Sequence, residues 1–511
     1  MVLHLLPISF YLLLSLLLFL FLKSIALKRE QRSHHLPPGP AALPFIGNIL
    51  KLGRLPHVSL RNLAAEHGPL MHLTLGQIPT IIASSKETAF EILRTQDRIF
   101  CSRPELIASS HLSYGGLDIA FSPYNDHWKQ IKRFSNAEFF GASKVESFRA
   151  IRDEEVGVLV NTIRKDWRDG KATDLSKMAV CFFNNVIHRE VFGNRASADG
   201  ECGESRHQDL IRAVIDVLPG FSIGDLFPRF WWLDWLTGWR LKLVRSFREM
   251  DKLFDEEIRE RQVKKSGLRR KEENFLDLLL RCEVEKHPLL GFLLSREDIK
   301  ALMMDLFFTA TETAAVTIEW GMSALMKNPI AMKKAQEEVR RVVGAGKLKV
   351  EEDDLQHLNY LKLVVNETLR LYPAAPLLGP HECMQDTRIN GYNIAAKTRV
   401  IINASAIGRD PKSWSDPESF QPERFLNGKI NYRGNHFEFI PFGSGRRICP
   451  GMAHGVIGVE IVFANLLYSF DWELPNGMQE KELDMEERYG VSISRKNPLF
   501  LMAKPAISVS I

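Results

Sequence analysis

The sequence predicts a mainly α-helical protein with small β-sheets, preceded by a transmembrane helix at the N-terminus. Apolar residues recur at helical spacing along most of the chain from about residue 85 onward. The alternation typical of strands is concentrated in two stretches, Leu70–Ser84 and Thr398–Ser405. The third observation is an uncharged run from Leu5 to Leu22. Together these patterns set the expected fold class.

The uncharged run has the length of a membrane span. As a helix it would extend about 27 Å at about 1.5 Å per residue, close to the roughly 30 Å of a bilayer core. A cleavable signal peptide is the alternative, but it usually has basic residues before its apolar run and a small-residue cleavage site. Here no clear cleavage site is present, and the basic residues follow the run: Lys23, Lys28, Arg29 and Arg32. We therefore expect a retained anchor.

Three segments follow from this interpretation. Residues 1–27 form the transmembrane anchor, and residues 28–42 form a basic and Pro-rich linker that contains LPPGP, Leu36–Pro40. Residues 43–511 form the main domain. Because cytosolic flanks carry the excess of Lys and Arg, the protein is expected to be single-pass with its body in the cytosol.

Composition excludes several other classes of protein. The chain has 511 residues and a net charge of +5. It has no long basic run interleaved with aromatic residues, so we expect no nucleic-acid partner. The cysteines form no CxxC pair, which argues against a disulfide framework and for a reducing compartment. The six are scattered: Cys101, Cys181, Cys202, Cys282, Cys383 and Cys449.

One predicted helix is unusually long. Ser295 and Asp298 have the spacing of a capping box, and apolar patterning then runs to Lys327, ahead of Asn328 and Pro329. Such a helix would be about 48 Å long and would cross the whole body. Its centre, FFTATETAAV, places a carboxylate and hydroxyls in an apolar neighbourhood. The pattern alone allows either a functional site or a solvated notch on one face.

The stretch PFGSGRRICPG, Pro441–Gly451, presents a single cysteine, Cys449. Its glycines let the backbone turn tightly and approach other groups closely. An apolar helical run follows, so Cys449 lies just before a helix N-terminus, where the helix dipole favours an anion. These surroundings are typical of a cysteine that reacts or ligates as a thiolate.

Four interpretations of Cys449 remain open on spacing alone. Zinc needs three or four protein ligands, and only His454 is nearby. A covalent nucleophile needs a paired base, and none stands at local spacing. An axial haem ligand needs only one protein residue. An inert buried cysteine would explain neither the glycines nor the arginines.

The motifs then form a recognisable set. FGSGRRICPG resembles the haem-binding loop of the cytochrome P450 family, whose pattern is Phe-x-x-Gly-x-Arg-x-Cys-x-Gly. ETLR resembles the Glu-x-x-Arg pair of that family, and FQPERF resembles its meander segment. The resemblance covers essentially the whole chain and is greatest to the plant A-type group. The matching residues are Phe442, Gly445, Arg447, Cys449 and Gly451 in the loop, with Glu367, Arg370 and Arg424 as a structural network.

The resemblance implies roles for further residues. Cys449 would be the axial thiolate ligand of haem b, Phe442 would pack near it, and Arg447 would pair with a haem propionate. Trp128 matches the Trp of a Trp-x-x-x-Arg propionate anchor, with Lys132 at the Arg position and Arg133 one residue further. Lysine keeps the charge but loses the bidentate fork. His381 stands where many relatives carry an arginine near the other propionate.

The long helix departs from the family pattern Ala/Gly-Gly-x-Asp/Glu-Thr-Thr/Ser. The acid–alcohol pair is kept as Glu312 and Thr313, whereas Ala310 replaces the glycine and Ala314 replaces the second hydroxyl. Thr309 adds a new hydroxyl. We expect Glu312, Thr313 and Thr309 to be the catalytic residues for oxygen activation.

The implied function is a cytochrome P450 fold acting as a haem-thiolate monooxygenase of the endoplasmic reticulum membrane. It would use O₂, electrons from NADPH–cytochrome P450 reductase, and an apolar plant specialised metabolite such as a terpenoid, phenolic or alkaloid. The alternatives are another haem-thiolate reaction, such as oxidative ring coupling, and a non-catalytic membrane haem-binding protein. The aromatic segment Phe227–Trp239 is expected to contact lipid. Expected pocket segments are Ile107–Phe121, Asp305–Thr313, Ala375–Gly379 and Tyr489–Ser494.

Overall fold

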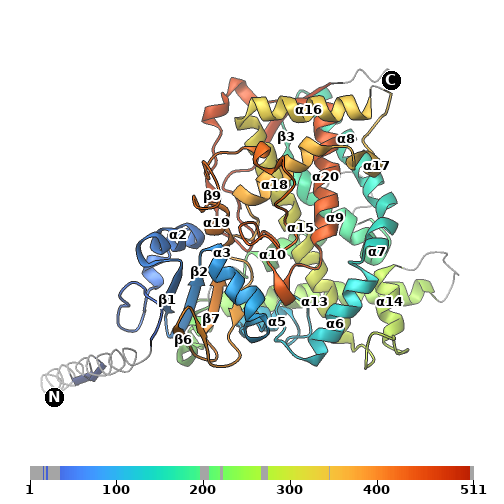
Figure 1. Ribbon diagram of the computed structural model, residues 1–511. Coiled ribbons are helices and arrows are strands. Elements are labelled where there is room, and N and C mark those ends of the chain that lie inside the picture. Colours follow the sequence, from blue (N-terminus) through green and yellow to red (C-terminus); the bar gives the residue numbers. More distant parts are fainter. Residues whose placement is uncertain are drawn as a thin grey trace, which may run out of the picture.

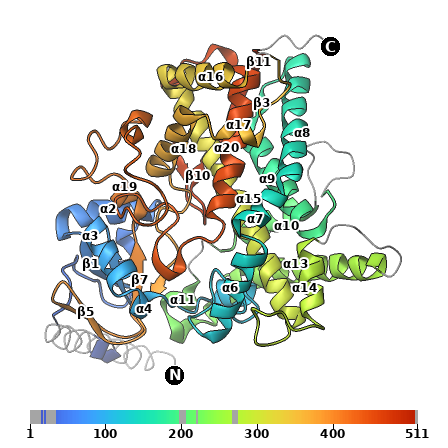
Figure 2. The ribbon, with the colours of Figure 1, turned by 45° about the vertical axis from the view of Figure 1, so that its right-hand side comes forward.

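The computed structural model describes residues 15–16, 19–20, 35–195, 206–218, 222–265, 274–344 and 346–506. Figure 1 shows a large helical part, with β1, β2, β6 and β7 gathered to one side of it. The turned view in Figure 2 keeps α9, α15 and α20 together in the middle of the helical part. The prediction of a mainly helical fold with small sheets is confirmed.

The helices and strands have the following bounds. The helices are α2 Pro56–His67, α3 Lys86–Phe90, α4 Asp97–Phe100, α5 Ile107–Leu112, α6 Asp126–Glu138, α7 Ala142–Ser147, α8 Arg149–Arg168, α9 Leu175–Phe192, α10 Arg206–Ile215, α11 Ile223–Leu226, α12 Leu233–Leu236, α13 Trp239–Lys265, α14 Phe275–Cys282, α15 Arg296–Lys327, α16 Pro329–Val343, α17 Glu352–Leu355, α18 Asn359–Leu371, α19 Ala404–Gly408 and α20 Met452–Ser469. The strands are β1 Leu70–Leu75, β2 Ile78–Ala83, β3 Thr173–Asp174, β4 His381–Glu382, β5 Thr387–Ile389, β6 Tyr392–Ile394, β7 Arg399–Ile402, β8 Phe470–Glu473, β9 Glu487–Arg488, β10 Ser494–Arg495 and β11 Phe500–Pro505.

The largest sheet has the strand order β1-β2-β7-β4. Both predicted strand regions contribute to it, because β1 and β2 form a hairpin and β7 pairs with β2 in parallel. Side chains alternate between the two faces of each strand. Val400 packs in one apolar cluster, whereas Ile401 packs in another with Leu226 of α11. The sheet therefore buries both faces.

The long helix α15 has the ends that the sequence predicts. The Ser295 hydroxyl accepts a hydrogen bond from the Asp298 N–H, and the Asp298 side chain accepts one from the Ser295 N–H. The helix ends at Lys327, and Pro329 begins α16. Most of its side chains are buried on all sides. A helix that is apolar all round belongs in the core of a large protein.

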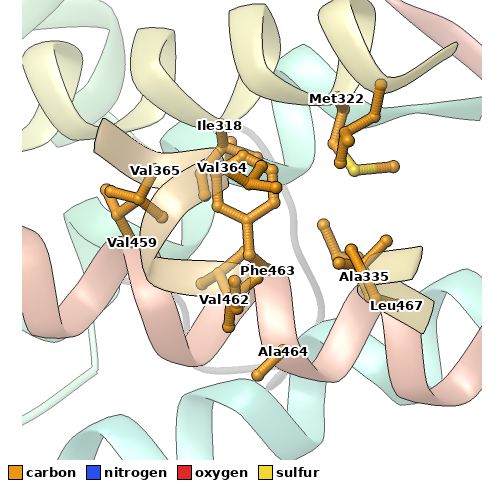
Figure 3. Packing of buried hydrophobic residues seen from close by; sticks show 14 of the residues in the cluster. Ile318, Met322, Ala335, Val364, Val365, Val459, Val462, Phe463, Ala464 and Leu467 are labelled. Carbon is orange, nitrogen blue, oxygen red and sulfur yellow. The ribbon is translucent and has the colours of Figure 1, made fainter. Parts of the chain in front are cut away.

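The packing of α15 against α20 and α18 is shown in Figure 3, where the Phe463 ring of α20 points toward Ile318 and Val364. Gly321 makes this approach possible, since a Cβ at that position would overlap the Phe463 ring. The packing of α15 against α20 therefore requires a glycine at position 321.

Two helices, Arg296–Lys327 and Met452–Ser469, are long and apolar enough to cross a membrane. In each, 78% of the most apolar window is buried inside the protein, so both are core helices. The expected anchor at residues 1–27 lies outside the described residues except for Ser15, Leu16, Phe19 and Leu20.

The described part of the expected linker packs against the body. The His72 N–H of β1 donates to the Pro38 carbonyl at 2.9 Å, and the Asn393 N–H of β6 donates to the His35 carbonyl at 2.7 Å. The Pro-rich joint is therefore fixed to two sheets, through β6 at residue 35 and through β1 at residue 38. Among the cysteines, Cys101, Cys383 and Cys449 are free, while Cys181 is disulfide-bonded, which the scattered spacing did not predict.

Candidate functional site

The loop around Cys449 holds its shape through glycines with left-handed backbone. Gly443 and Gly445 have φ of +72° and +69°, a region that side chains disfavour. A Cβ on Gly445 would also overlap the Leu93 carbonyl of the π-helical turn Glu91–Thr95. Gly451 does not need the conformational freedom that we expected of the loop glycines. It caps α20 with φ of −82°, and a Cβ there would meet Phe140 at an ordinary 3.5 Å. Its glycine is not needed for the turn.

The Cys449 sulfur lines the main cavity, and the Cys449 N–H donates to the Phe442 carbonyl at 3.0 Å. Burial raises the pKa of the Cys449 thiol, while the Gly451 N–H and the Lys132 charge lower it. Desolvation is the largest of these three effects on the thiol. A bound metal cation is the kind of partner that deprotonates a thiol outright.

The cavity has a volume of about 500 Å³ and mostly apolar walls. One wall is the middle of α15, where Ala310 and Ala314 face the cavity, and another is the cysteine loop from Pro441 to Gly451. All four expected pocket segments contribute wall residues. Such a space between a helix and a loop suits a flat apolar molecule.

One edge of the cavity gathers four basic side chains: Arg103, Lys132, His381 and Arg447. Burial lowers the pKa of all four, to about 10, 8, 3 and 9 in that order. Arg103 further lowers the pKa of the other three. Because these groups disfavour one another's charge, an anionic ligand at this edge would stabilise them.

The Arg447 guanidinium is held in place by neutral groups. It donates to the backbone carbonyls of Cys101 and Ser122, the latter at 2.7 Å. It also lies 3.9 Å from the centre of the Trp128 ring, a cation–π distance. The Trp128 indole N–H donates to the Ile119 carbonyl at 2.9 Å. Trp128 therefore supports Arg447.

Lys132 and Arg133 are separated by the geometry of α6. The Lys132 ammonium reaches the cavity and donates to the Arg446 carbonyl. The Arg133 guanidinium instead donates to the Leu289 carbonyl at 3.0 Å, and Arg133 is not part of the cavity wall. The expectation that Arg133 could bind at the cavity is wrong, because one residue along a helix turns a side chain by about 100°.

Arg103 is the site residue that sequence reasoning missed. It follows α4, lines the cavity, and donates to the carbonyls of Ala120 at 3.1 Å and Pro380 at 2.8 Å. It belongs to none of the recognised motifs. The available signal was a single positive charge in the stretch IFCSRPEL, where Glu105 is the only other charged residue.

His381 lies beside Arg103 on β4. Its side chain is buried, and its Nδ1 lies 2.7 Å from the Phe100 carbonyl. With a pKa lowered to about 3 by burial and by the Arg103 charge, the ring is neutral near pH 7. Its single N–H is therefore on Nδ1 and donates to the Phe100 carbonyl, so that Nε2 can only accept and the ring offers no charge.

On α15, Thr309 and Thr313 line the cavity. Each hydroxyl donates to the carbonyl four residues earlier, Thr309 to Asp305 and Thr313 to Thr309, both at 2.7 Å. This back-bonding is common for threonines within helices. It leaves the oxygen lone pairs free to accept from a molecule in the cavity.

Glu312 is not brought to the cavity wall, contrary to its expected place beside Thr313. Burial raises the pKa of its carboxyl to about 7, opposed by the nearby Ser492 hydroxyl and by the Arg488 charge. Ser492 does line the cavity, and its hydroxyl has no hydrogen-bond partner among the described residues. Glu312 is therefore close to the cavity wall but is not part of it.

A pair of buried carboxyls ties the loop after α5 to α15. The Asp305 carboxyl accepts the Ile119 N–H at 2.6 Å, and Asp118 accepts the Ser122 N–H at 2.7 Å. Burial raises the pKa of both carboxyls, and for Asp305 the Asp118 charge raises it further. Sequence reasoning named Asp305 only as the start of a pocket segment.

The expected network of Glu367, Arg370 and Arg424 lies outside the cavity wall. Arg370 donates to both Glu367 carboxylate oxygens at 2.7 and 2.8 Å, and Arg424 donates to one at 3.0 Å. All three side chains are almost completely buried. The contacts join α18 to the segment that leads toward the cysteine loop.

The sequence model described as "Cytochrome P450" matches residues 37–502. The chain belongs to the cytochrome P450 family. Among curated proteins it is 46% identical to "Cytochrome P450 71A1" of Persea americana, covering 90% of this chain and 92% of the relative. It is 42% identical to "Desmethyl-deoxy-podophyllotoxin synthase" of Sinopodophyllum hexandrum, covering 97% and 96%. It is 41% identical to "5-epiaristolochene 1,3-dihydroxylase" of Nicotiana tabacum, covering 96% and 97%.

This cytochrome P450 is a monooxygenase, and the relatives named above are plant enzymes, as the resemblance implied. Cytochromes P450 bind haem through a thiolate. The residues present fit that group, because Cys449 lines a mostly apolar cavity and the cations Arg103, Lys132 and Arg447 at its edge could pair with carboxylates. The described residues contain no cluster of three or more His, Cys, Asp or Glu side chains that could hold a metal ion, which leaves the zinc alternative without support.

Proposed function

We propose that this P450 monooxygenase holds haem b through Cys449 and hydroxylates or otherwise oxidises an apolar plant specialised metabolite, such as a terpenoid, phenolic or alkaloid. The observation that carries the proposal is the Cys449 sulfur on the wall of a mostly apolar cavity edged by four basic side chains. Two relatives are named as a 5-epiaristolochene dihydroxylase and a desmethyl-deoxy-podophyllotoxin synthase, and their names support a substrate of this class.

Haem, when bound, supplies activation of O₂ and insertion of one oxygen atom into the substrate. The chain's residues bind and orient it. Arg447, Lys132 and Arg103 would offer charge to its propionates. His381 would line the same edge as a neutral ring, since its single N–H donates to the Phe100 carbonyl. Phe442 lies on the cavity wall, where its ring contacts Tyr432 edge-to-face at 5.6 Å, and we expect it to pack near the haem and Cys449.

Protons reach the cavity through hydroxyls. With a pKa raised to about 7, Glu312 can hold or release a proton near neutral pH, and the Ser492 hydroxyl lies near it on the cavity wall. Thr309 and Thr313 keep acceptor lone pairs for a water on the α15 wall. Positioned acid–base groups of this kind typically contribute about 10²–10⁴-fold to a rate.

The proposed partners are NADPH–cytochrome P450 reductase, O₂ and membrane lipid. The proposed location is the endoplasmic reticulum membrane, with residues 1–27 as a single-pass anchor, residues 28–42 as a linker and the catalytic domain in the cytosol. The exposed aromatic side chains Phe230, Trp231, Trp232 and Trp235 support a second lipid contact, since indoles favour the membrane–water boundary.

The function is tested by incubating membranes that carry the protein and the reductase with NADPH and a mixture of plant terpenoids, phenolics and alkaloids. We expect products that gain one oxygen from O₂ in an isotope-labelled atmosphere. Membranes that carry Cys449→Ser are the matched control. Absence of any oxygenated product, with haem bound and NADPH supplied, would contradict the proposal.

A further inference from the structure

Besides the four basic side chains at its edge, the cavity carries Arg399, which the oxidation chemistry does not use. Arg399 is the first residue of β7, is 5% exposed and lines the cavity. Its Nη2 donates to the Asp225 backbone carbonyl over a long 3.4 Å. Its Nε and Nη1 have no hydrogen-bond partner among the described residues. A buried guanidinium left with two unpartnered nitrogens is costly, so a missing partner is expected.

The carboxylates around Arg399 are engaged elsewhere. The Asp225 carboxylate accepts the Ile107 N–H at 2.8 Å, and Glu382, the cross-strand neighbour of Arg399, pairs with Lys397 at 2.8 Å. Neither forms an ion pair with Arg399. Both still offset its charge, because burial lowers the pKa of Arg399 and these two carboxylates raise it. Arg399 therefore lacks a hydrogen-bond acceptor rather than a counter-charge.

Arg399 is separate from the cationic edge that fits the propionates. His381 stands opposite Val400 in the β4–β7 register, so these two side chains share one face of the sheet. Arg399 lies on the other face with Ile401, which packs near Leu226 of α11 and Leu377. Side chains from both faces of the sheet line the same cavity. His381 belongs to the cationic edge, whereas Arg399 lies apart from that edge.

We propose that Arg399 binds a neutral oxygen of the substrate, a hydroxyl or carbonyl group, while the apolar skeleton lies along the cavity. The inference rests on the proposed function only in taking this cavity as the substrate site. The substrate is then an apolar skeleton that already carries one oxygen. A reaction that introduces oxygen must precede this enzyme and supply its substrate.

The test uses the purified holoenzyme, without NADPH, and three probes that share one skeleton: farnesene, farnesol and farnesoic acid. Equilibrium dialysis measures the three dissociation constants. We expect farnesol to bind about tenfold more tightly than farnesene, the usual size of one hydrogen bond to a charged donor. Arg399→Met should remove that difference and leave farnesene binding within about twofold. Arg399→Lys should retain part of it.

The matched control is Ile401→Val, two residues along the same strand face, which should change the binding of all three probes by a similar factor. Equal binding of farnesol and farnesene by the wild type would overturn the proposal. So would a farnesol preference that survives Arg399→Met. If farnesoic acid binds far more tightly than farnesol in an Arg399-dependent way, the site is for carboxylates and the neutral-oxygen proposal is wrong.

Substrate binding and product formation are measured separately. The carbon monoxide spectrum of each reduced variant reports whether the haem site is folded, and Arg399→Lys provides an intact protein if Arg399→Met does not fold. Failure to form oxygenated products, with the farnesol preference present, would count against the proposed function and not against the Arg399 site.

Discussion

Cys449 lies where burial works against its own ionisation. The thiol is raised in pKa by its surroundings, and the Gly451 N–H and Lys132 only partly offset that effect. A bound metal cation is the kind of partner that would hold such a sulfur as a thiolate.

Replacing Cys449 by serine should abolish the thiolate signature in the spectrum of the reduced carbon monoxide complex, because a hydroxyl does not form an equivalent axial bond. Cys383→Ser is the matched control. Its thiol is also buried, and it donates to the Gln385 carbonyl at 3.0 Å, a bond that serine can keep. A Cys449→Ser protein with an unchanged spectrum and turnover would exclude Cys449 as the ligand.

Thr313→Ala should lower the amount of product formed per NADPH consumed and release more peroxide, with little change in substrate binding. Thr309→Ala should act in the same direction, and the double variant should be worse than either. The reason is that both hydroxyls face the cavity with free lone pairs. NADPH, peroxide and product are measured together.

Thr311→Val provides the control for these variants, since Thr311 is buried on another side of α15 and does not line the cavity. Unchanged coupling in Thr309→Ala would show that the Thr309 hydroxyl only bonds the Asp305 carbonyl and has no role in oxygen activation. Unchanged coupling in Thr313→Ala would remove the oxygen-activation role from this part of the helix.

Glu312→Gln should change how stability depends on pH. The folded-state pKa of Glu312 is about 7, above its ordinary 4.5, so the folded protein binds the extra proton between these values. The protonated Glu312 carboxyl contributes its full share to the free energy of unfolding below pH 4.5. That share is lost as the pH rises through 7 and the carboxyl ionises. Raising the pH from 5 to 8 should therefore cost the wild type about 1–3 kcal/mol more of its free energy of unfolding than it costs Glu312→Gln, which cannot ionise at this position.

This dependence is measured by urea unfolding at both pH values. Glu338→Gln, on the distant α16, is the comparison variant, because its carboxylate accepts backbone N–H groups of Tyr360 and Leu361. A pH-independent difference between Glu312→Gln and wild type would show that Glu312 is not perturbed.

At the scale of single elements, α15 was the part most fully predictable from sequence. Its capping box and its Asn-Pro end are local signals, and both ends were predicted correctly. Which residues face the cavity was not predictable in the same way. Glu312 and Thr313 are adjacent in sequence but point to different neighbours, Ser492 in one case and the cavity in the other. The neighbours come from distant segments.

The cysteine loop shows the same division. Its motif identified Cys449 and Arg447, and the left-handed glycines Gly443 and Gly445 explain part of its composition. The companion cation Arg103 could not be found, because it belongs to no motif and meets Arg447 only through tertiary folding. Arg133 was wrongly included because the sequence does not show which side of α6 faces the cavity. Lys132 and Arg133 are neighbours in sequence, but only Lys132 is on that side.

Gly321→Ala should destabilise the core by about 1–3 kcal/mol, the usual cost of overpacking. The added methyl would overlap the Phe463 ring between α15 and α20. The free energy of unfolding is measured with Phe463→Leu as a second variant, and the double variant should recover part of the loss. Additive losses in the double variant would show that the ring and the methyl do not meet.

At the scale of the whole molecule, the aromatic segment after α11 is fastened to the body on several sides. The buried Asp234 accepts the Ile223 N–H at 2.7 Å and the Gly224 N–H at 3.0 Å. The Leu226 carbonyl accepts the Gln77 N–H of the β1–β2 turn at 2.8 Å. Its exposed tryptophans are therefore presented from a rigid base.

Removal of residues 1–28 should release the protein from the integral membrane fraction but leave weak peripheral binding. Alkaline carbonate extraction tests the first part, and flotation with phosphatidylcholine vesicles tests the second. In the truncated protein, the change of Trp231, Trp232 and Trp235 to alanine should remove the remaining vesicle affinity. The matched control changes Trp167, an exposed tryptophan on α8. Equal losses in both would argue against a specific lipid-contacting surface.

The apolar lining of the cavity has a consequence for how kinetics should be read. A substrate that suits such walls partitions from water into lipid, by about 0.8 kcal/mol for each buried methylene, so its dissolved concentration is not the concentration the enzyme meets. An apparent KM quoted per volume of water would then rise in proportion to the amount of lipid added. Expressed as mole fraction in the bilayer, the same constant should stay fixed, which makes lipid titration part of any fair comparison of substrates.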